Sequence, residues 1–221
     1  MALILNIETS TRNCSVSVAR DGKLVALCEE SKENYEHAEK LHRFMQWALE
    51  AEDLSFEDLD AVCVSKGPGS YTGLRIGVSA AKGLCFSLNI PLLSLNSLEI
   101  LARSVENENN ADYIIPMIDA RRKEVYTATF TPQMQIIEKT NAKILDETSF
   151  QSFNNKKIIV LGDGASKASE ILKLENATYL TESLPSAKDM CAESFKLYQN
   201  QQFEDVAYFE PFYLKDFVAG K

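Results

Sequence analysis

Apolar and polar positions along the first thirty residues follow the pattern of strands. An apolar run covers residues 3–7, a looser alternation follows at 14–19, and a third strand is predicted at 23–28. Between the last two runs, Asp21-Gly22 is a two-residue hairpin signal. The pattern therefore predicts that the chain opens with a β-hairpin meander.

The period changes to that of a helix over residues 36–52. The positions that recur on one side at helical spacing are Ala38, Leu41, Phe44, Met45, Ala48, Leu49 and Glu52. Trp47 lies about 110° from the centre of this stripe. It either packs under a neighbouring loop or faces a partner protein, since tryptophan is enriched at interfaces.

A short strand at 61–64 precedes a glycine-rich turn and a second helix at 73–88. One side of this helix is an ordinary core stripe made of Leu74, Gly77, Val78, Ala81, Leu84, Cys85 and Leu88. A second side carries Gly73, Ile76, Ala80 and Gly83. Small residues at that spacing let another helix approach closely, although a helix enclosed within one chain shows the same pattern.

The stretch 106–110 is the most polar of the chain and divides it into two halves, and a strand is expected at 92–95 before it. The elements predicted beyond it are strands at 113–118, 124–130, 133–138 and 156–161 and helices at 165–173 and 187–199. The aromatic stretch 208–214 is expected to pack back on the body. We predict an N-terminal lobe at 1–105, joined by 205–221, and a C-terminal lobe at 106–204, each mixing strands and helices.

Charge and cysteine content narrow the functional classes. The net charge of −9 disfavours a protein that grips nucleic acid unaided, because such binding depends on neutralising phosphates. The five cysteines are widely spaced and form no C-x-x-C pair, which favours reduced, buried thiols over a zinc site. With no signal peptide and no apolar run long enough to span a membrane, a cytoplasmic protein is expected.

Two segments are candidates for holding phosphate. A glycine turn between a strand and a helix can bind phosphate through free backbone N–H groups, and this one offers Gly67, Gly69, Ser70 and Thr72. It matches neither the Walker A nor the Rossmann spacing, and Ser70 or Thr72 can cap the helix. A purely architectural turn is the alternative.

The other candidate segment, Glu8, Thr9 and Ser10, occupies the place of the first phosphate loop of actin-like and sugar-kinase-like ATPases. Most of those proteins carry aspartate there, so Glu8 weakens a claim of ATP hydrolysis.

Catalytic chemistry has little support in the sequence. The only histidines, His37 and His42, lie about 140° apart on their helix and cannot hold one metal ion from one face. There is no Gly-x-Ser-x-Gly elbow. The charged run 119–126 forms either the mouth of a cleft between the halves or a solvated turn with internal ion pairs.

These segments, taken in order, resemble the TsaB (YeaZ) family over essentially the whole chain. The resemblance rests on Leu-Asn-Ile-Glu-Thr-Ser-Thr, Cys-Ser-Val-Ser-Val from 14, Ser-Lys-Gly-Pro-Gly-Ser-Tyr-Thr-Gly-Leu-Arg-Ile-Gly from 65, Asp-Ala-Arg-Arg-Lys-Glu-Val-Tyr from 119 and Pro-Phe-Tyr-Leu-Lys from 211. It implies the actin/Hsp70/sugar-kinase-like (ASKHA) fold in a shortened, two-lobed α/β form with mixed sheets flanked by helices.

The resemblance further implies a scaffold role in tRNA modification. Members pair with the catalytic subunit TsaD, and the ATPase subunit TsaE joins them. Together they transfer threonylcarbamoyl to N6 of the adenosine 3′ of the anticodon in tRNAs that read codons beginning with A. The family pairs and self-associates through its N-terminal lobe, so Trp47 and the face formed by Gly73, Ile76, Ala80 and Gly83 are our candidate pairing residues.

On this reading the chain has no catalytic residue, no metal and no intrinsic cofactor, and it meets tRNA only indirectly. A homodimer is expected when it is alone, and ATP or ADP can enter within the complex. Two other readings stay open: a nucleotide-binding regulatory module and a divergent glycoprotease-like peptidase.

Overall fold

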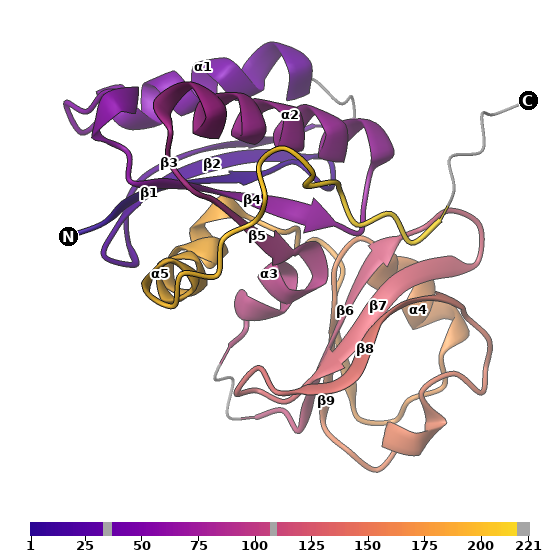
Figure 1. Ribbon diagram of the computed structural model, residues 1–221. Coiled ribbons are helices and arrows are strands. Elements are labelled where there is room, and N and C mark those ends of the chain that lie inside the picture. Colours follow the sequence, from indigo (N-terminus) through magenta and orange to yellow (C-terminus); the bar gives the residue numbers. More distant parts are fainter. Residues whose placement is uncertain (33–36, 107–109, 216–221) are drawn as a thin grey trace, which may run out of the picture. The chain divides into compact units, whose positions relative to one another are not determined.

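The computed structural model describes residues 1–32, 37–106 and 110–215 and divides the chain into two compact units (Figure 1). Unit 1 combines residues 1–100 with the chain from 186 onward, and unit 2 covers 101–185. The start of the helix predicted at 36–52, the middle of the polar stretch 106–110 and the end of the segment 205–221 lie outside the described residues.

Unit 1 is built from a five-stranded mixed sheet and its helices. Its elements are β1 (Leu3–Glu8), β2 (Asn13–Arg20), β3 (Lys23–Ser31), α1 (His37–Glu50), the 3-10 turn η1 (Phe56–Asp58), β4 (Ala61–Gly67), α2 (Tyr71–Leu88), β5 (Leu92–Asn96), the start of α3 (Ser97–Arg103), η3 (Ala187–Met190) and α5 (Cys191–Gln199). The strand order is β3-β2-β1-β4-β5. The predicted meander is confirmed, because β1, β2 and β3 pair antiparallel, whereas β4 and β5 join in parallel.

The alternation along β1 sends neighbouring side chains into different cores. Leu5 and Ile7 pack with α1 and α2 on one face of the sheet, while Ile4 packs on the other face with Met190 and Phe195 beside it. Figure 1 shows α1 and α2 side by side over one face and α5 on the opposite face. Unit 1 therefore has three layers, and β1 is buried on both sides, as its continuous apolar run predicts.

Unit 2 repeats the architecture of unit 1. Its elements are β6 (Tyr113–Asp119), β7 (Glu124–Phe130), β8 (Ile136–Ile144), the 3-10 turn η2 (Gln151–Phe153), β9 (Ile158–Leu161), α4 (Gly164–Ile171) and β10 (Ala177–Leu180). Its sheet order, β10-β9-β6-β7-β8, is that of unit 1 read from the other edge. In each unit the first three strands form an antiparallel meander and the last two add in parallel. The predicted α/β class with two mixed sheets flanked by helices is confirmed.

Several boundaries differ from the prediction. The strand expected at 133–138 runs instead over 136–144, and two short elements, α3 and β10, were not predicted. The helix expected at 187–199 begins as the 3-10 turn η3. Ala38 is exposed despite its place in the predicted core stripe of α1, and Glu52 lies beyond the end of that helix.

Residues 186–204 lie in unit 1, whereas we predicted them in the C-terminal lobe. Hydrogen bonds to β2 and β3 hold them there. The Ala187 N–H donates to Ser15 Oγ (3.0 Å), the Ser17 hydroxyl donates to the Ala187 carbonyl (2.8 Å), and the Ser186 hydroxyl donates to Glu29 Oε2 (2.6 Å). These contacts join positions about 160 residues apart in sequence, so local patterns could not reveal them.

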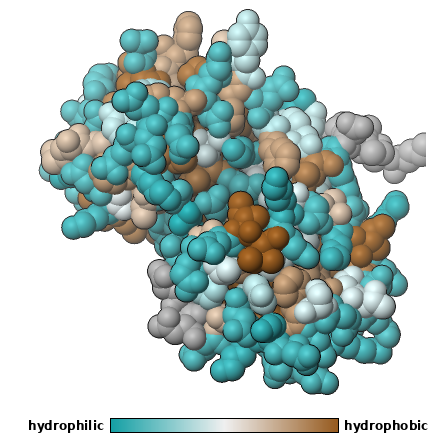
Figure 2. Space-filling view, turned by 60° about the horizontal axis from the view of Figure 1, so that its bottom comes forward, coloured by the Kyte–Doolittle hydropathy of each residue, from teal (hydrophilic) through white to brown (hydrophobic). Residues whose placement is uncertain are grey.

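Most of the face drawn in Figure 2 is hydrophilic, with hydrophobic atoms in small separate groups. Among the large hydrophobic side chains, Phe86 and Tyr208 are each 84% exposed and Ile144 is 70% exposed. Among the described residues, none of the helices is both long and apolar enough to cross a membrane.

Candidate functional site

The glycine turn after β4 packs directly against the turn between β1 and β2. A Cβ atom at Gly69 would overlap the carbonyl oxygen of Ser10, and one at Gly73 would overlap the carbonyl oxygen of Thr9. One at Gly77 would overlap the Thr9 hydroxyl. These glycines are therefore required for a close approach of two backbone segments, because any side chain would push the segments apart.

Three N–H groups of the glycine turn already have hydrogen-bond partners. The Ser70 N–H donates to the Ser10 carbonyl at 2.7 Å. The Ser70 side chain accepts the Gly73 N–H at 3.3 Å, so Ser70 rather than Thr72 is the N-cap of α2. The Leu74 N–H donates to the Ser70 carbonyl at 2.9 Å. This geometry favours the architectural reading of the turn.

The two candidate phosphate segments are thus brought together, as the nucleotide hypothesis expects, but they fill each other's space. The Thr9 hydroxyl donates to the Gly73 carbonyl at 2.8 Å. Glu8, Thr9 and Ser10 are fully buried, and Thr72 alone of the candidate nucleotide residues is exposed. Gly67 has a φ of +109° and lies against the Phe212 carbonyl oxygen rather than facing an open cradle.

Glu8 is the most perturbed carboxyl group of this site. Burial raises its pKa from 4.5 to about 7, an effect that hydrogen bonds from Ser10 and Ser65 partly offset. Its Oε1 accepts the Ser10 N–H at 2.5 Å, whereas its Oε2 is buried without a hydrogen-bond partner. A carboxyl group held in this way is protonated over a much wider pH range than a surface glutamate.

The histidines and cysteines occupy structural positions. His37 is buried, with Nε2 2.7 Å from the Thr11 carbonyl oxygen, while His42 is exposed. The described residues contain no group of three His, Cys, Asp or Glu side chains arranged to hold a metal ion. Burial raises the pKa of Cys14 and of Cys85 to about 12, which leaves these thiols protonated at neutral pH.

The predicted pairing residues do not share one exposed face. Gly73 is buried against Thr9, and Ile76 and Ala80 are partly buried against the core between α1 and α2. Gly83 is exposed, and a Cβ there would meet no atom within 4 Å. Trp47 is 46% exposed on α1, with its ring centre 5.9 Å from that of Phe44.

Sequence reasoning missed the one large apolar side chain of α2 that is mostly exposed among the described residues. Phe86 is 84% exposed and follows Gly83 by three positions, on the same side of the helix. On α1, the Arg43 guanidinium lies 5.1 Å from the centre of the Trp47 ring. The available signal in the sequence was Phe86 itself, a large apolar residue that does not belong to the core stripe of α2.

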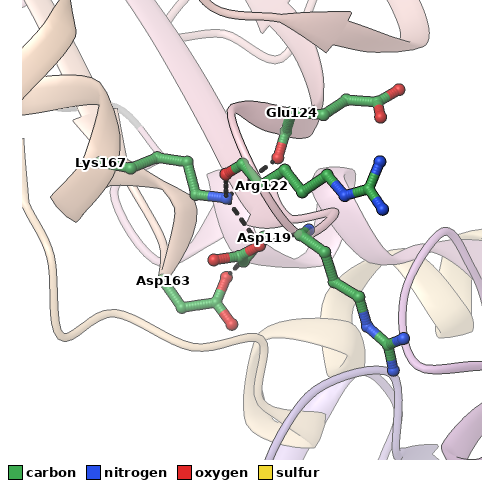
Figure 3. A network of polar contacts seen from close by, with 6 residues as sticks. Asp119, Arg122, Glu124, Asp163 and Lys167 are labelled. Carbon is green, nitrogen blue, oxygen red and sulfur yellow. Dashed lines mark hydrogen bonds and ion pairs between the residues drawn. The ribbon is translucent and has the colours of Figure 1, made fainter. Parts of the chain in front are cut away.

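The charged run 119–126 covers the end of β6, a turn and the start of β7, and an ion pair to Lys167 of α4 holds the turn (Figure 3). Lys167 of α4 places its ammonium group 2.7 Å from Asp119 Oδ1 and donates to the carbonyl oxygens of Arg122 (2.8 Å) and Glu124 (3.1 Å). Arg121 and Arg122 both have positive φ, 71° and 53°, a conformation that non-glycine residues adopt only when neighbours hold them. Lys167 supplies that restraint, and the sequence alone did not indicate it.

Comparisons with known proteins agree with one another. The family described as "TsaD: tRNA N6-adenosine threonylcarbamoyltransferase" matches residues 31–219. The tRNA threonylcarbamoyladenosine biosynthesis protein TsaB of Escherichia coli K12 is 30% identical over 99% of this chain and 96% of that protein. TsaB of Bacillus subtilis 168 is 32% identical over 77% of this chain and 75% of its own. The structure of YeaZ from Pseudomonas aeruginosa has the same fold, with a TM-score of 0.86 at 24% identity over 97% of this chain and all of that one.

Proposed function

This chain belongs to the TsaB family of tRNA threonylcarbamoyladenosine biosynthesis proteins, and on that premise we propose that it is a non-catalytic subunit that acts by pairing with the catalytic transferase subunit. The observation that carries the proposal is that α1 exposes Trp47 and α2 exposes Gly83 and Phe86 in unit 1.

Gly83 is the most informative of these three exposed residues. A glycine in the middle of an exposed helix costs about 0.5–1 kcal/mol relative to alanine. Among the described residues no neighbour explains the glycine, since a Cβ at this position would meet no atom within 4 Å. A partner helix that approaches α2 closely would explain it, because small residues such as glycine let two helices come close together.

Phe86 and Trp47 supply the apolar part of the surface. Both are large side chains that water contacts in the isolated chain, and burying them against a partner would contribute roughly 1–2 kcal/mol each. Aromatic residues of this kind dominate the energetics of many interfaces. The same surface can pair two copies of this chain when the catalytic subunit is absent.

The buried, protonated state of the cysteine thiols supports a non-catalytic role. All five thiols are free and have pKa values raised by burial. A buried neutral thiol is a weak nucleophile, because the thiolate is the reactive form. In this proposal the catalytic subunit, TsaD, performs the transfer to tRNA and the ATPase subunit, TsaE, joins the pair. The protein acts in the cytoplasm, where that tRNA is found.

Reconstitution tests the proposal directly. The catalytic subunit, the ATPase subunit, tRNA and threonylcarbamoyl-adenylate are mixed with and without this chain, and modified adenosine is measured by mass spectrometry of digested tRNA. We expect modification to require this chain. Unchanged modification in its absence would refute the proposal.

Two further measurements distinguish this function from the alternatives of a nucleotide-binding module and a peptidase. ATP binding is measured with a fluorescent analogue on the isolated chain and on the complex. Saturable binding to the isolated chain would favour a nucleotide-binding regulatory module, and peptide hydrolysis by the isolated chain would favour a peptidase.

A further inference from the structure

After α5 the chain crosses unit 1 as residues 203–213, a segment with a turn at 206–208, which we call the C-terminal strap. The Glu204 N–H donates to the Leu92 carbonyl of β5 at 2.8 Å, and the Phe212 N–H donates to the Lys66 carbonyl of β4 at 2.7 Å. Between these points, Lys82 of α2 donates to the carbonyl oxygens of Ala207 and Phe209. The strap is therefore fixed at both ends and in the middle.

The strap carries both core-facing and exposed side chains. Phe209 packs against the core of unit 1. Tyr208, Glu210 and Phe212 are exposed, with Tyr208 at 84% and Phe212 at 39%. The exposed side chains of the strap therefore include a carboxylate and two aromatic rings. The prediction that this stretch packs back on the body is confirmed for its backbone and for Phe209, although Tyr208 is left exposed.

A pocket of about 590 Å³ lies between the strap and the carboxyl ends of β4 and β5. Lys66, Glu204, Tyr208 and Phe212 are among the residues that line it. The carboxyl ends of parallel strands are a usual place for binding sites in α/β proteins. The volume lies in the range of pockets that hold small ligands or side chains of a partner.

The charge of the pocket is negative. Three carboxylates line it, those of Glu204, Asp205 and Glu210, against the single ammonium group of Lys66. Lys66 is already offset by Glu204, whose Oε1 lies 3.9 Å away. Within the part of the chain that the structure describes, the Glu210 carboxylate makes neither an ion pair nor a hydrogen bond. The pocket therefore combines an unpaired carboxylate with two aromatic rings in its lining.

Aromatic faces beside a carboxylate are the elements that recognise an organic cation. The ring face attracts the cation through its quadrupole, and the carboxylate adds a charge-assisted hydrogen bond. We propose that this pocket receives an arginine or lysine side chain that a partner protein presents. Charge complementarity supports a protein occupant, since the chain carries −9 overall and the pocket opens widely to solvent between polar and aromatic residues.

Arginine fits this pocket better than lysine does. Its planar guanidinium group stacks on an aromatic ring and donates two parallel hydrogen bonds to a carboxylate. Tyr208 or Phe212 would supply the ring, and Glu210 the carboxylate. The strap needs no rearrangement for this, because its backbone is already held by Lys66, Lys82 and Leu92.

A titration of the full chain tests the proposal without any partner. The ¹⁵N-labelled protein is titrated with the capped peptide Gly-Arg-Gly and with the same peptide carrying citrulline, the neutral isostere of arginine. Amide shifts are followed by NMR. We expect saturable shifts over residues 208–212 with the arginine peptide in the millimolar range, and binding about three- to fivefold weaker with citrulline.

Two charge-matched variants locate the effect. Glu210→Gln should weaken binding of the arginine peptide about threefold or more, as should Tyr208→Ala. Glu175→Gln removes one exposed carboxylate from unit 2 and should leave binding unchanged. Equal binding of the two peptides, equal effects of the two glutamate variants, or the absence of shifts over 208–212 would overturn the proposal. Tighter binding of spermidine than of the peptide would also overturn it, in favour of a polyamine.

Discussion

Thr9 and Gly73 are in contact through backbone and side chain, although 64 residues separate them in sequence. The Thr9 hydroxyl donates to the Gly73 carbonyl at 2.8 Å, and the Thr9 carbonyl oxygen occupies the space of a Cβ at Gly73. This contact closes the glycine turn against the loop after β1. It explains why the start of α2 can look like a phosphate cradle in sequence and serve as a packing joint in the structure.

Gly73→Ala should destabilise the chain by about 3 kcal/mol, because the new methyl group would overlap a backbone atom that cannot rotate away. Urea unfolding followed by Trp47 fluorescence measures this change. A loss below about 0.5 kcal/mol, the range of ordinary surface substitutions, would contradict the close packing of the two turns.

Gly83→Ala is the matched control and should act in the opposite direction. The added methyl group meets open space and lowers the entropy of the unfolded chain, so the free energy of unfolding should rise by about 0.5–1 kcal/mol. The same urea experiment measures it. If α2 pairs closely with a partner helix, Gly83→Leu should in addition weaken pairing while the isolated chain stays folded.

Phe86→Asp tests the pairing surface without disturbing the core. The side chain is 84% exposed, so the stability of the isolated chain should change by no more than about 0.5 kcal/mol. Pairing with the catalytic subunit, measured by isothermal titration calorimetry, should weaken about tenfold or more.

Ile144→Asp is the control for Phe86→Asp, since Ile144 is 70% exposed on β8 of unit 2 and lies outside the proposed surface. It should leave the affinity unchanged. Equal losses for the two variants would show that a general loss of surface hydrophobicity, rather than the α2 face, accounts for the effect.

The raised pKa of Glu8 makes stability depend on pH. The folded chain keeps the proton up to about pH 7, while the unfolded chain releases it near 4.5. Between these values the native state binds more protons than the unfolded state, so stability falls as pH rises. The contribution present below pH 4.5 is lost by about pH 7, and the shift corresponds to about 3 kcal/mol.

Glu8→Gln should remove this dependence, because the amide oxygen can still accept the Ser10 N–H and carries no charge. Urea unfolding at pH 5 and pH 8 measures the difference for both proteins. The variant should be the more stable of the two at pH 8 by an amount that shrinks at pH 5. A constant difference between the two proteins across this range would contradict a protonated Glu8.

Cys28 should be the first thiol to react with an aromatic disulfide reagent in the native protein. It is partly exposed on β3, whereas Cys14, Cys63, Cys85 and Cys191 are at most 4% exposed. Absorbance at neutral pH should show one faster phase, which Cys28→Ser removes, and the remaining thiols should react only after unfolding. Early reaction of a second thiol would indicate an opening of unit 1 that the structure does not contain.

Strands and helices with a strong local period could be predicted from the sequence. The apolar run of β1 and the 3.6-residue period of α1 depend only on which neighbours share a face, and both appear where expected. The exceptions α3 and β10 have seven and four residues, too few for a period to stand out. The two units share a strand order although the sequence shows no corresponding repeat.

The sequence by itself determined the class of fold, the meander, and the family to which the motifs belong. Only the tertiary structure decided what the glycine turn does, that Glu8 is buried, that residues 186–204 pack with unit 1, and that the strap exposes Tyr208 and Glu210. The physical reason is the separation along the sequence between the residues that make contact. A periodic pattern reports contacts within one element, whereas these features depend on backbone and side-chain atoms that folding brings together from distant parts of the chain.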